Sequence, residues 1–233
     1  MSAQGQQVVI LKEGTQRSTG RDARGSNIMA ARIVSEAVKT SLGPKGMDKM
    51  LVDSFGDVTI TNDGATMLKE MDVQHPAAKM MVEVSKTQDD EVGDGTTSVV
   101  ILTGELLGKA TELMEKKVHP TVIIDGYRQA EEKALAILKE ISEKVDPKDK
   151  ATLMNVSKTT MASKLVNQHS EYLSDISVDA VLQIAEPEGD GYTVDLDMIK
   201  IEKKPGASMT ETRLVRGLII DKEVVHDGMP KQI

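Results

Sequence analysis

The sequence predicts a multidomain chain that is mainly α-helical in its first part and mixed α/β in its second. Apolar residues recur at helical spacing in several long segments between residues 27 and 144. Beyond Asp146-Pro147 the elements become shorter and more polar. A chain of 233 residues is long enough for one large domain or for two smaller ones. We therefore place a domain boundary at Asp146-Pro147.

The composition excludes several classes of protein. The formal net charge is −8 and aromatic residues make up 2% of the chain, which argues against a nucleic-acid-binding surface. The absence of cysteine removes disulfides, thiolate nucleophiles and zinc-thiolate sites. No run of about 18 apolar residues is present, and the first residues lack the pattern of a secretion signal. The composition predicts a cytoplasmic protein that neither spans a membrane nor binds nucleic acid.

The first 70 residues contain two predicted strands and two predicted helices. Residues 8–11 form a short apolar run, which predicts a terminal strand. A helix is expected over residues 27–41, with Ser26 as its N-cap and Gly43-Pro44 as its stop. After a turn at 47–52, a strand at 57–61 leads through a turn at 62–64 into a short helix that ends near Glu70.

Three longer helices follow. Pro76 suits a first helical turn and predicts a helix to about residue 86, followed by a polar loop at 87–95. The next helix is expected over 96–117. It contains Gly104 and Gly108, each of which costs about 1 kcal/mol relative to alanine unless a neighbouring helix approaches closely. We interpret this pair as a packing groove. A break at 119–121 precedes a long amphipathic helix that ends near residue 144.

The second part contains two predicted helices followed by two predicted strands. Helices are predicted near residues 150–157 and 170–185, with a loop at 159–164 between them. A turn at 186–191 precedes predicted strands at 192–202 and 212–221. The presence of both kinds of element agrees with the mixed α/β assignment.

One loop, residues 93–98, has the strongest chemical logic. Its glycines expose backbone N–H groups where a helix begins, and the residues that follow carry hydroxyl groups, namely Thr96, Thr97 and Ser98. A helix N-terminus favours anions, so this segment could bind phosphate. Asp94 would repel phosphate unless a divalent cation bridged the two, which suggests a magnesium nucleotide. The alternative, at about equal odds, is an ordinary turn with a helix N-cap.

Other candidate residues have simpler alternatives. The segment Leu42-Gly43-Pro44 could line a phosphate site, although such a sequence more often only ends a helix. Asp63 could polarise an attacking water, although its spacing alone favours a tight turn. Lys164 could neutralise charge on a terminal phosphate, although most lysines in polar loops are solvated. The chain lacks the G-x-x-x-x-G-K-[ST] pattern of P-loop proteins, and its four histidines have no metal-ligand spacing.

Four long motifs together resemble one family. TSLGPKGMDKMLVDS, VTITNDGATMLKEMDVQHPAAKM, EVSKTQDDEVGDGTTSVVILTGELL and VHPTVIIDGY occur in this order. They are similar to the group II chaperonins, which are the thermosome family of archaea and its eukaryotic cytosolic relatives. The segment IKIEKKPGASMTETRLVRGLIIDKEVVHDGMP extends the resemblance over essentially the whole chain. The archaeal branch is the nearer match.

The resemblance implies a subunit of an ATP-driven double ring that binds unfolded proteins and folds them in an enclosed chamber. Its cofactors would be ATP and Mg²⁺, and its partners would be other chaperonin subunits in a homo- or hetero-oligomer. The implied domains are the N-terminal half of a split, mainly α-helical equatorial domain at 1–146, the N-terminal half of an α/β intermediate domain at 147–214 and the start of an apical domain at 215–233.

The resemblance also implies roles for particular residues. Asp94 would hold magnesium, and Asp63 would position the hydrolytic water as the catalytic carboxylate. The nucleotide-binding residues would be Leu42, Gly43, Pro44, Gly95, Thr96, Thr97, Ser98 and Lys164. Ser98 stands where many archaeal members carry threonine, a change that keeps the hydroxyl group.

The 233 residues contain only part of the domain organisation that the family pattern implies. The second half of the equatorial domain, with another catalytic aspartate, is not among them, and nor is most of the apical domain. We therefore expect a fragment of a longer subunit that acts as an ATPase when complete. The alternatives are a truncated, non-hydrolysing chaperonin-like module that binds nucleotide or unfolded protein passively, and a small phosphotransferase.

Overall fold

The structure is a computed structural model, and it describes residues 17–189, 191–222, 225–226 and 228–230. The chain forms two compact units, Met1–Ala134 and Leu135–Ile233, which we describe separately. The expected strand at residues 8–11 lies outside the described residues. The expected domains, 1–146, 147–214 and 215–233, remain predictions.

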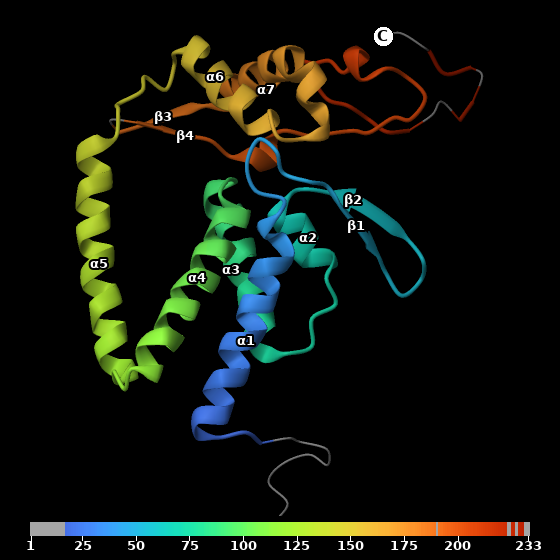
Figure 1. Cartoon of the computed structure of the whole chain (residues 1–233). Helices are drawn as coiled ribbons and strands as arrows, with labels where there is room; N and C mark the ends of the chain where they lie inside the picture. Colours follow the sequence, from blue (N-terminus) through green and yellow to red (C-terminus); the bar gives the residue numbers. More distant parts are fainter. Residues whose placement is uncertain (1–16, 190, 223–224, 227, 231–233) are drawn as a thin grey trace, which may run out of the picture. The chain divides into compact units, whose positions relative to one another are not determined.

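Helices α1, α2, α3 and α4 form the core of the first unit (Figure 1). The elements of this unit are α1 (Gly20–Lys39), β1 (Lys49–Val52), β2 (Val58–Thr61), α2 (Gly64–Glu70), α3 (Pro76–Val92), α4 (Thr96–Glu115) and the first part of α5 (Pro120–Ile141). Pro76 occupies the first turn of α3, where its missing N–H group has no helical partner to lose. The predictions of α2 and of the start of α4 are confirmed.

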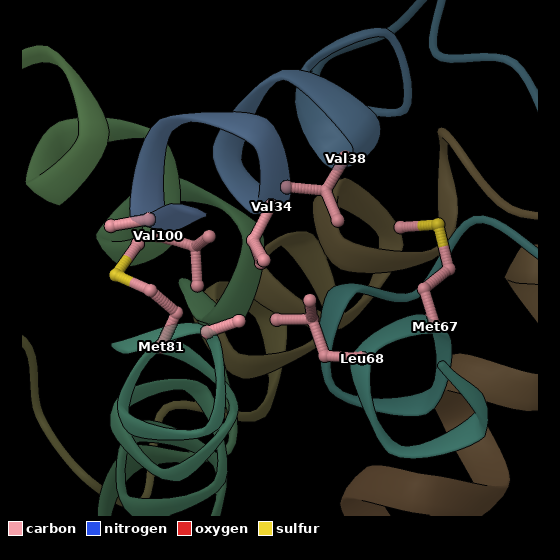
Figure 2. Close-up of a cluster of buried hydrophobic side chains, with 8 residues drawn as sticks. Val34, Val38, Met67, Leu68, Met81 and Val100 are labelled. Atoms are coloured by element: carbon pink, nitrogen blue, oxygen red, sulfur yellow. The ribbon is translucent and has the colours of Figure 1, made fainter. Parts of the chain in front are cut away.

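Aliphatic and methionine side chains from four helices meet in this core. Figure 2 shows Val34 and Val38 of α1 pointing toward Met67 and Leu68 of α2, with Val100 of α4 beside them. The remaining members of the cluster are Ala31, Ala78 and Met81. With almost no aromatic residues in the chain, flexible methionines fill the gaps between β-branched side chains. The burial of one large side chain contributes about 1.5–3 kcal/mol.

The contact between α1 and α4 is close because α4 carries a glycine there. A Cβ atom built on Gly104 would lie 2.3 Å from Ser35 Oγ and 2.4 Å from Ser35 Cβ. The predicted packing role is therefore confirmed for Gly104. A Cβ on Gly108 would meet only the Arg32 side chain, at 3.5 Å or more, which is ordinary contact. Gly108 is not a site of close helix packing.

Three boundary predictions in the first unit are wrong. Helix α1 begins at Gly20 rather than near residue 27, so Ser26 is an interior residue and Thr19 is the N-cap. Asp22 in the first turn favours this earlier start through the helix dipole. Helix α3 continues through the predicted loop to Val92, since its acidic residues face solvent and Gly93 ends it.

The third error is the turn expected at 47–52. Lys49–Val52 is strand β1, and it pairs antiparallel with β2 in the register Lys49 to Thr61 and Val52 to Val58. The turn lies between the strands, where the Asp53 carboxylate accepts hydrogen bonds from the N–H groups of Phe55 and Asp57, both at 2.9 Å. Local propensity did not reveal β1 because its stability comes from pairing with β2.

The second unit consists of two packed helices and a small hairpin. Its elements are the end of α5, α6 (Lys150–Met161), the 3₁₀ turn η1 (Leu165–His169), α7 (Ser170–Ile184), β3 (Glu186–Glu188), β4 (Gly191–Thr193), and the 3₁₀ turns η2 (Leu196–Met198) and η3 (Met209–Glu211). Helix α7 is confirmed, and α6 runs four residues further than expected. The strands expected at 192–202 and 212–221 are wrong apart from Tyr192 and Thr193, the last two residues of β4, because the described residues after Thr193 find no sheet partner.

Candidate functional site

The loop at residues 93–98 has the geometry of an open helix N-terminus. Gly93 has φ 70° and ends α3, and Gly95 has φ 77° and is the N-cap of α4. The N-cap provides no side-chain hydrogen bond. The N–H group of Val99 donates to the Gly95 carbonyl oxygen at 2.9 Å. The N–H groups of Thr96, Thr97 and Ser98 lie in the first turn, where an α-helix offers no backbone carbonyl to accept them. This helix end suits an anion.

Two side chains on α3 anchor this loop from behind. The Gln88 Nε2 atom donates a hydrogen bond to the Asp94 carbonyl oxygen at 2.8 Å. The Ser85 hydroxyl, which is fully buried, donates to the Thr96 carbonyl oxygen at 3.4 Å. Thr96 and Thr97 are buried and Asp94 is exposed. The loop thus combines a fixed hydroxyl-bearing part with a solvent-facing carboxylate, whose Oδ1 accepts from the Gly95 N–H group at 2.8 Å.

Asp63 is held at the start of α2. It is the N-cap of that helix, and its Oδ2 atom accepts from the Thr66 N–H group at 3.0 Å and from the Thr66 hydroxyl at 2.8 Å. Asp63 is half-buried. The turn interpretation and the catalytic interpretation are therefore compatible, because the N-cap role fixes the direction of the carboxylate.

The start of α2 lies directly against the start of α4. Gly64 is buried, and a Cβ atom built on it would lie 2.4 Å from Thr97 Oγ1 and 2.7 Å from the Thr97 backbone nitrogen. No side chain fits between these two backbones. The structure therefore brings Asp63 next to the loop at 93–98, although the two segments are some thirty residues apart in the sequence.

The third predicted loop follows α1 and contacts α2 through Ser41, the residue before Leu42. Gly43 has φ 87°, and its carbonyl oxygen accepts from the Gly46 N–H group at 2.9 Å. Ser41, which is buried, approaches the sulfur of Met67 with its hydroxyl at 3.5 Å. Leu42 and Pro44 are exposed. The loop is thus fixed to α2, while its contact with a nucleotide stays a prediction.

Lys164 belongs to the second unit. It is the N-cap of η1 and is half-buried, and its N–H group donates to the Met161 carbonyl oxygen at 3.0 Å. Because the two units are described separately, its predicted contact with phosphate stays a prediction.

An exposed ion pair links the two helices that carry the loops. Lys39, the last residue of α1, donates from Nζ to Glu105 of α4 at 2.7 Å and to Glu36 at 3.2 Å. These hydrogen bonds raise the pKa of Lys39, and the bond to Lys39 lowers the pKa of Glu105. The pair is solvent-exposed and contributes little to stability.

A groove of about 1190 Å³ lies away from this site, along α1 from Arg21 to Glu36, the end of α4 and the turn before α5. None of the predicted site residues lines it. The starts of α2 and α4 are the better candidate site, because the backbone contact at Gly64 and Thr97 brings Asp63 close to the glycine-flanked loop that carries Asp94.

The acidic residues permit a single-carboxylate metal site. Within the described residues, no group of three or more His, Asp or Glu side chains is arranged to hold a metal ion. Magnesium commonly uses one or two protein carboxylates together with phosphate oxygens, so Asp94 beside an anion-binding helix end fits that ion. Among the residues that the structure describes, each helix is too short or too polar to cross a membrane.

Gln88 is a site residue that the sequence did not reveal. It lies in the segment TQDDEVG, whose polarity indicated a loop, and only the extension of α3 to Val92 brings its side chain back toward Asp94. A prediction that extended this helix to Gly93 would have placed Gln88 in its last turns, just before the loop.

Comparison with known proteins gives consistent relationships. A sequence model of the TCP-1/cpn60 chaperonin family matches residues 34–233. The chain is 62% identical to a thermosome subunit of Desulfurococcus sp. and 60% identical to the thermosome subunit beta of Thermococcus kodakarensis, over 98% of its length in each case. It is 59% identical to the thermosome subunit alpha of Archaeoglobus fulgidus over 99% of its length. The chain spans 42% of the length of each of these relatives.

Proposed function

The chain belongs to the TCP-1/cpn60 chaperonin family, and from this premise we propose that its first unit binds Mg-ATP between the loops at 42–44, 61–66 and 93–98 and takes part in its hydrolysis. The resemblance to archaeal thermosome subunits inferred from the four motifs is confirmed. The nucleotide, the residue roles and the coupling to protein folding are proposals.

The contact between Gly64 and Thr97 is the observation that carries this proposal. The helix start that follows Asp63 packs against the helix start that follows Gly95, with a Cβ-to-Oγ1 distance of only 2.4 Å for a side chain built on Gly64. A phosphate group held by the N–H groups and hydroxyls of α4 would therefore lie within reach of residues at the start of α2. A simple turn with an N-cap would not require the two helix starts to meet.

The residues after Gly95 would bind the phosphates. Thr96, Thr97 and Ser98 offer N–H groups at a helix N-terminus, where the helix dipole favours negative charge. Asp94 would hold the magnesium ion, which supplies positive charge to the phosphate oxygens when it is bound.

Asp63 would orient the attacking water. Thr66 holds Oδ2 of Asp63 through two hydrogen bonds, so the carboxylate has a defined direction before any substrate arrives. Positioning of this kind supplies much of the acceleration in phosphoryl transfer. A second carboxylate, expected from the family outside these 233 residues, would share this task.

The wider role follows from the family. We expect the full-length protein to assemble with like or related subunits into a cytoplasmic double ring, to bind unfolded proteins and to fold them with energy from ATP. Lys164 would contact the terminal phosphate and link its state to the second unit. The chain spans 42% of the length of the Desulfurococcus thermosome subunit, so these roles are proposed for the whole protein and not for the 233 residues alone.

The test uses Asp63→Ala in the full-length protein, with the exposed carboxylate variant Asp72→Ala as control. We expect Asp63→Ala to lower ATP turnover at least about a hundredfold, in line with the loss of a positioned general base, while ATP affinity stays within about twofold of the wild-type value. Phosphate release and calorimetric titration measure the two quantities.

Retained turnover in Asp63→Ala would remove Asp63 from the mechanism. A wild-type protein that binds Mg-ATP without turning it over would support the passive module, and one that shows no Mg-dependent nucleotide binding would overturn the proposed function.

A further inference from the structure

Gln88 and Asp94 are joined through a single peptide group. The Gln88 Nε2 atom donates to the carbonyl oxygen of Asp94 at 2.8 Å. The N–H group on the other side of the same peptide belongs to Gly95, and it donates to the Asp94 Oδ1 atom at 2.8 Å. One planar unit therefore carries both hydrogen bonds, one on each edge.

This arrangement fixes the direction of the carboxylate. The peptide group is planar, so the direction of its carbonyl determines the direction of its N–H group. Gly93 and Gly95 flank Asp94 with φ values of 70° and 77°, and glycine gives the backbone little intrinsic restraint. In the described part of the chain, the hydrogen bonds to Asp94 come from Gln88 and Gly95. Without Gln88 the Asp94-Gly95 peptide would lose the hydrogen bond that holds its carbonyl, so this peptide could turn, and the carboxylate bonded to its N–H group could turn with it.

We infer that Gln88 is a positioning residue that orients the Asp94 carboxylate for a magnesium ion by holding the Asp94-Gly95 peptide. The inference rests on the proposed function, which assigns that ion to Asp94. Groups that orient a metal ligand without touching the metal are often worth 10–100-fold in metal affinity, by the order of magnitude seen in other sites.

The rest of the loop has a separate anchor. Ser85 holds the Thr96 carbonyl oxygen, and Thr96 and Thr97 are buried against the helices. Loss of the Gln88 hydrogen bond should therefore leave the phosphate-binding N–H groups in place. The inference predicts a selective loss of magnesium-dependent affinity, whereas general loosening of the loop would weaken nucleotide binding with and without the metal.

The experiment compares ADP binding in the full-length protein with Mg²⁺ and with a chelator. Gln88→Met removes the donor while it keeps the side-chain length and the helix propensity. The control is Gln183→Met, which makes the same change at an exposed position of α7. We expect Gln88→Met to weaken Mg-ADP binding about tenfold and to change metal-free ADP binding less than about twofold, and the control to change neither.

A second readout needs no ligand. Hydrogen exchange at the Gly95 N–H group should be faster in nucleotide-free Gln88→Met than in the wild type, because the Asp94-Gly95 peptide is no longer held. Exchange at the Val100 N–H group, in the α4 core, reports whether the fold is intact.

Gln88→Asn provides a further variant should Gln88→Met fail to fold. It keeps the amide but is one methylene too short to reach the Asp94 carbonyl, and it should show the same selective loss. Wild-type-like Mg-ADP binding in the folded variant, or equal weakening with and without metal, would overturn the inference while the proposed function stands. A wild-type protein without Mg-dependent ADP binding would instead overturn the proposed function.

Discussion

Different kinds of contact stabilise the inside of each of the two units. In the first unit, backbones of different helices meet directly, at Gly64 against Thr97 and at Gly104 against Ser35. In the second, α6 and α7 are linked by exposed ion pairs, in which Lys150 contacts Asp175 and Asp179 at 2.8 and 2.6 Å. The difference teaches that one added methyl group at such a glycine should disturb the first unit strongly, whereas loss of an exposed charge should disturb the second only slightly.

Gly64→Ala should give the largest effect. The added methyl group would overlap Thr97, and because the obstacle is backbone as well as side chain, α2 and α4 must move apart. We expect a loss of about 1–3 kcal/mol in the free energy of unfolding, as for other overpacked sites, and at least tenfold weaker Mg-nucleotide binding. Denaturant unfolding and calorimetry measure the two effects.

The matched control is Gly25→Ala in α1, where no atom lies within 4 Å of the built Cβ. It should be neutral or slightly stabilising. Normal nucleotide binding by Gly64→Ala would show that the close approach of α2 and α4 is not needed for the site.

Gly104→Ala and Gly108→Ala form a second pair within one helix. A Cβ on Gly104 would lie 2.4 Å from Ser35 Cβ, and so the change should destabilise the protein by about 1–3 kcal/mol. Gly108→Ala meets only the end of a flexible arginine and should stabilise the protein by up to about 1 kcal/mol through helix propensity. Unfolding in urea gives both values. Equal effects from the two changes would remove the distinction between them.

Lys150→Met should give the smallest effect. The hydrogen bonds to Asp175 and Asp179 raise the pKa of Lys150 above its ordinary value of 10.5. The ion pairs therefore contribute fully below that pH, and their contribution is lost as the pH rises through the raised pKa. We expect a small fall in Tm at pH 7, which shrinks in high salt because exposed charges are screened.

The control for this change is Lys144→Met, which removes an exposed lysine beyond the end of α5. A fall in Tm that is unaffected by salt would show that the aliphatic part of Lys150, rather than its charge, holds α6 to α7.

Local chemistry made some parts of this fold predictable. Asp63 and Gly95 are N-caps in the structure, as their sequence context predicted. An N-cap is predictable because it depends on only a few neighbouring residues. Gly104 could be predicted as a close contact because a glycine inside a helix lowers helix stability, which a close approach of another helix can offset.

Other parts depend on partners that are distant in sequence. Strand β1 was missed because β2 defines it, and the strand expected at 212–221 did not form because the described residues provide no sheet partner for it. The end of α3 was misplaced because Asp89 and Asp90 are polar on the solvent side of a helix, where polarity carries no information about its end.

The same division applies to the candidate site. The proposed roles of Asp94 and of the hydroxyl groups after it come from residue types, and the proposed role of Asp63 comes from the resemblance. The contact between Gly64 and Thr97 was not predictable, because it is a product of how α2 packs on α4. Gln88 was missed for a related reason. Its hydrogen bond to the Asp94 carbonyl oxygen forms only because α3 continues to Val92.

The close approach of α1 and α4 at Ser35 and Gly104 also bears on the loop where α4 begins. At about 1.5 Å per residue, Gly104 lies about 12 Å from the start of α4 at Thr96. A bulkier residue at Gly104 would push α4 away from α1, and the helix would carry that displacement to Thr96 and Thr97. The glycine would thereby influence the 93–98 loop from about two helical turns away.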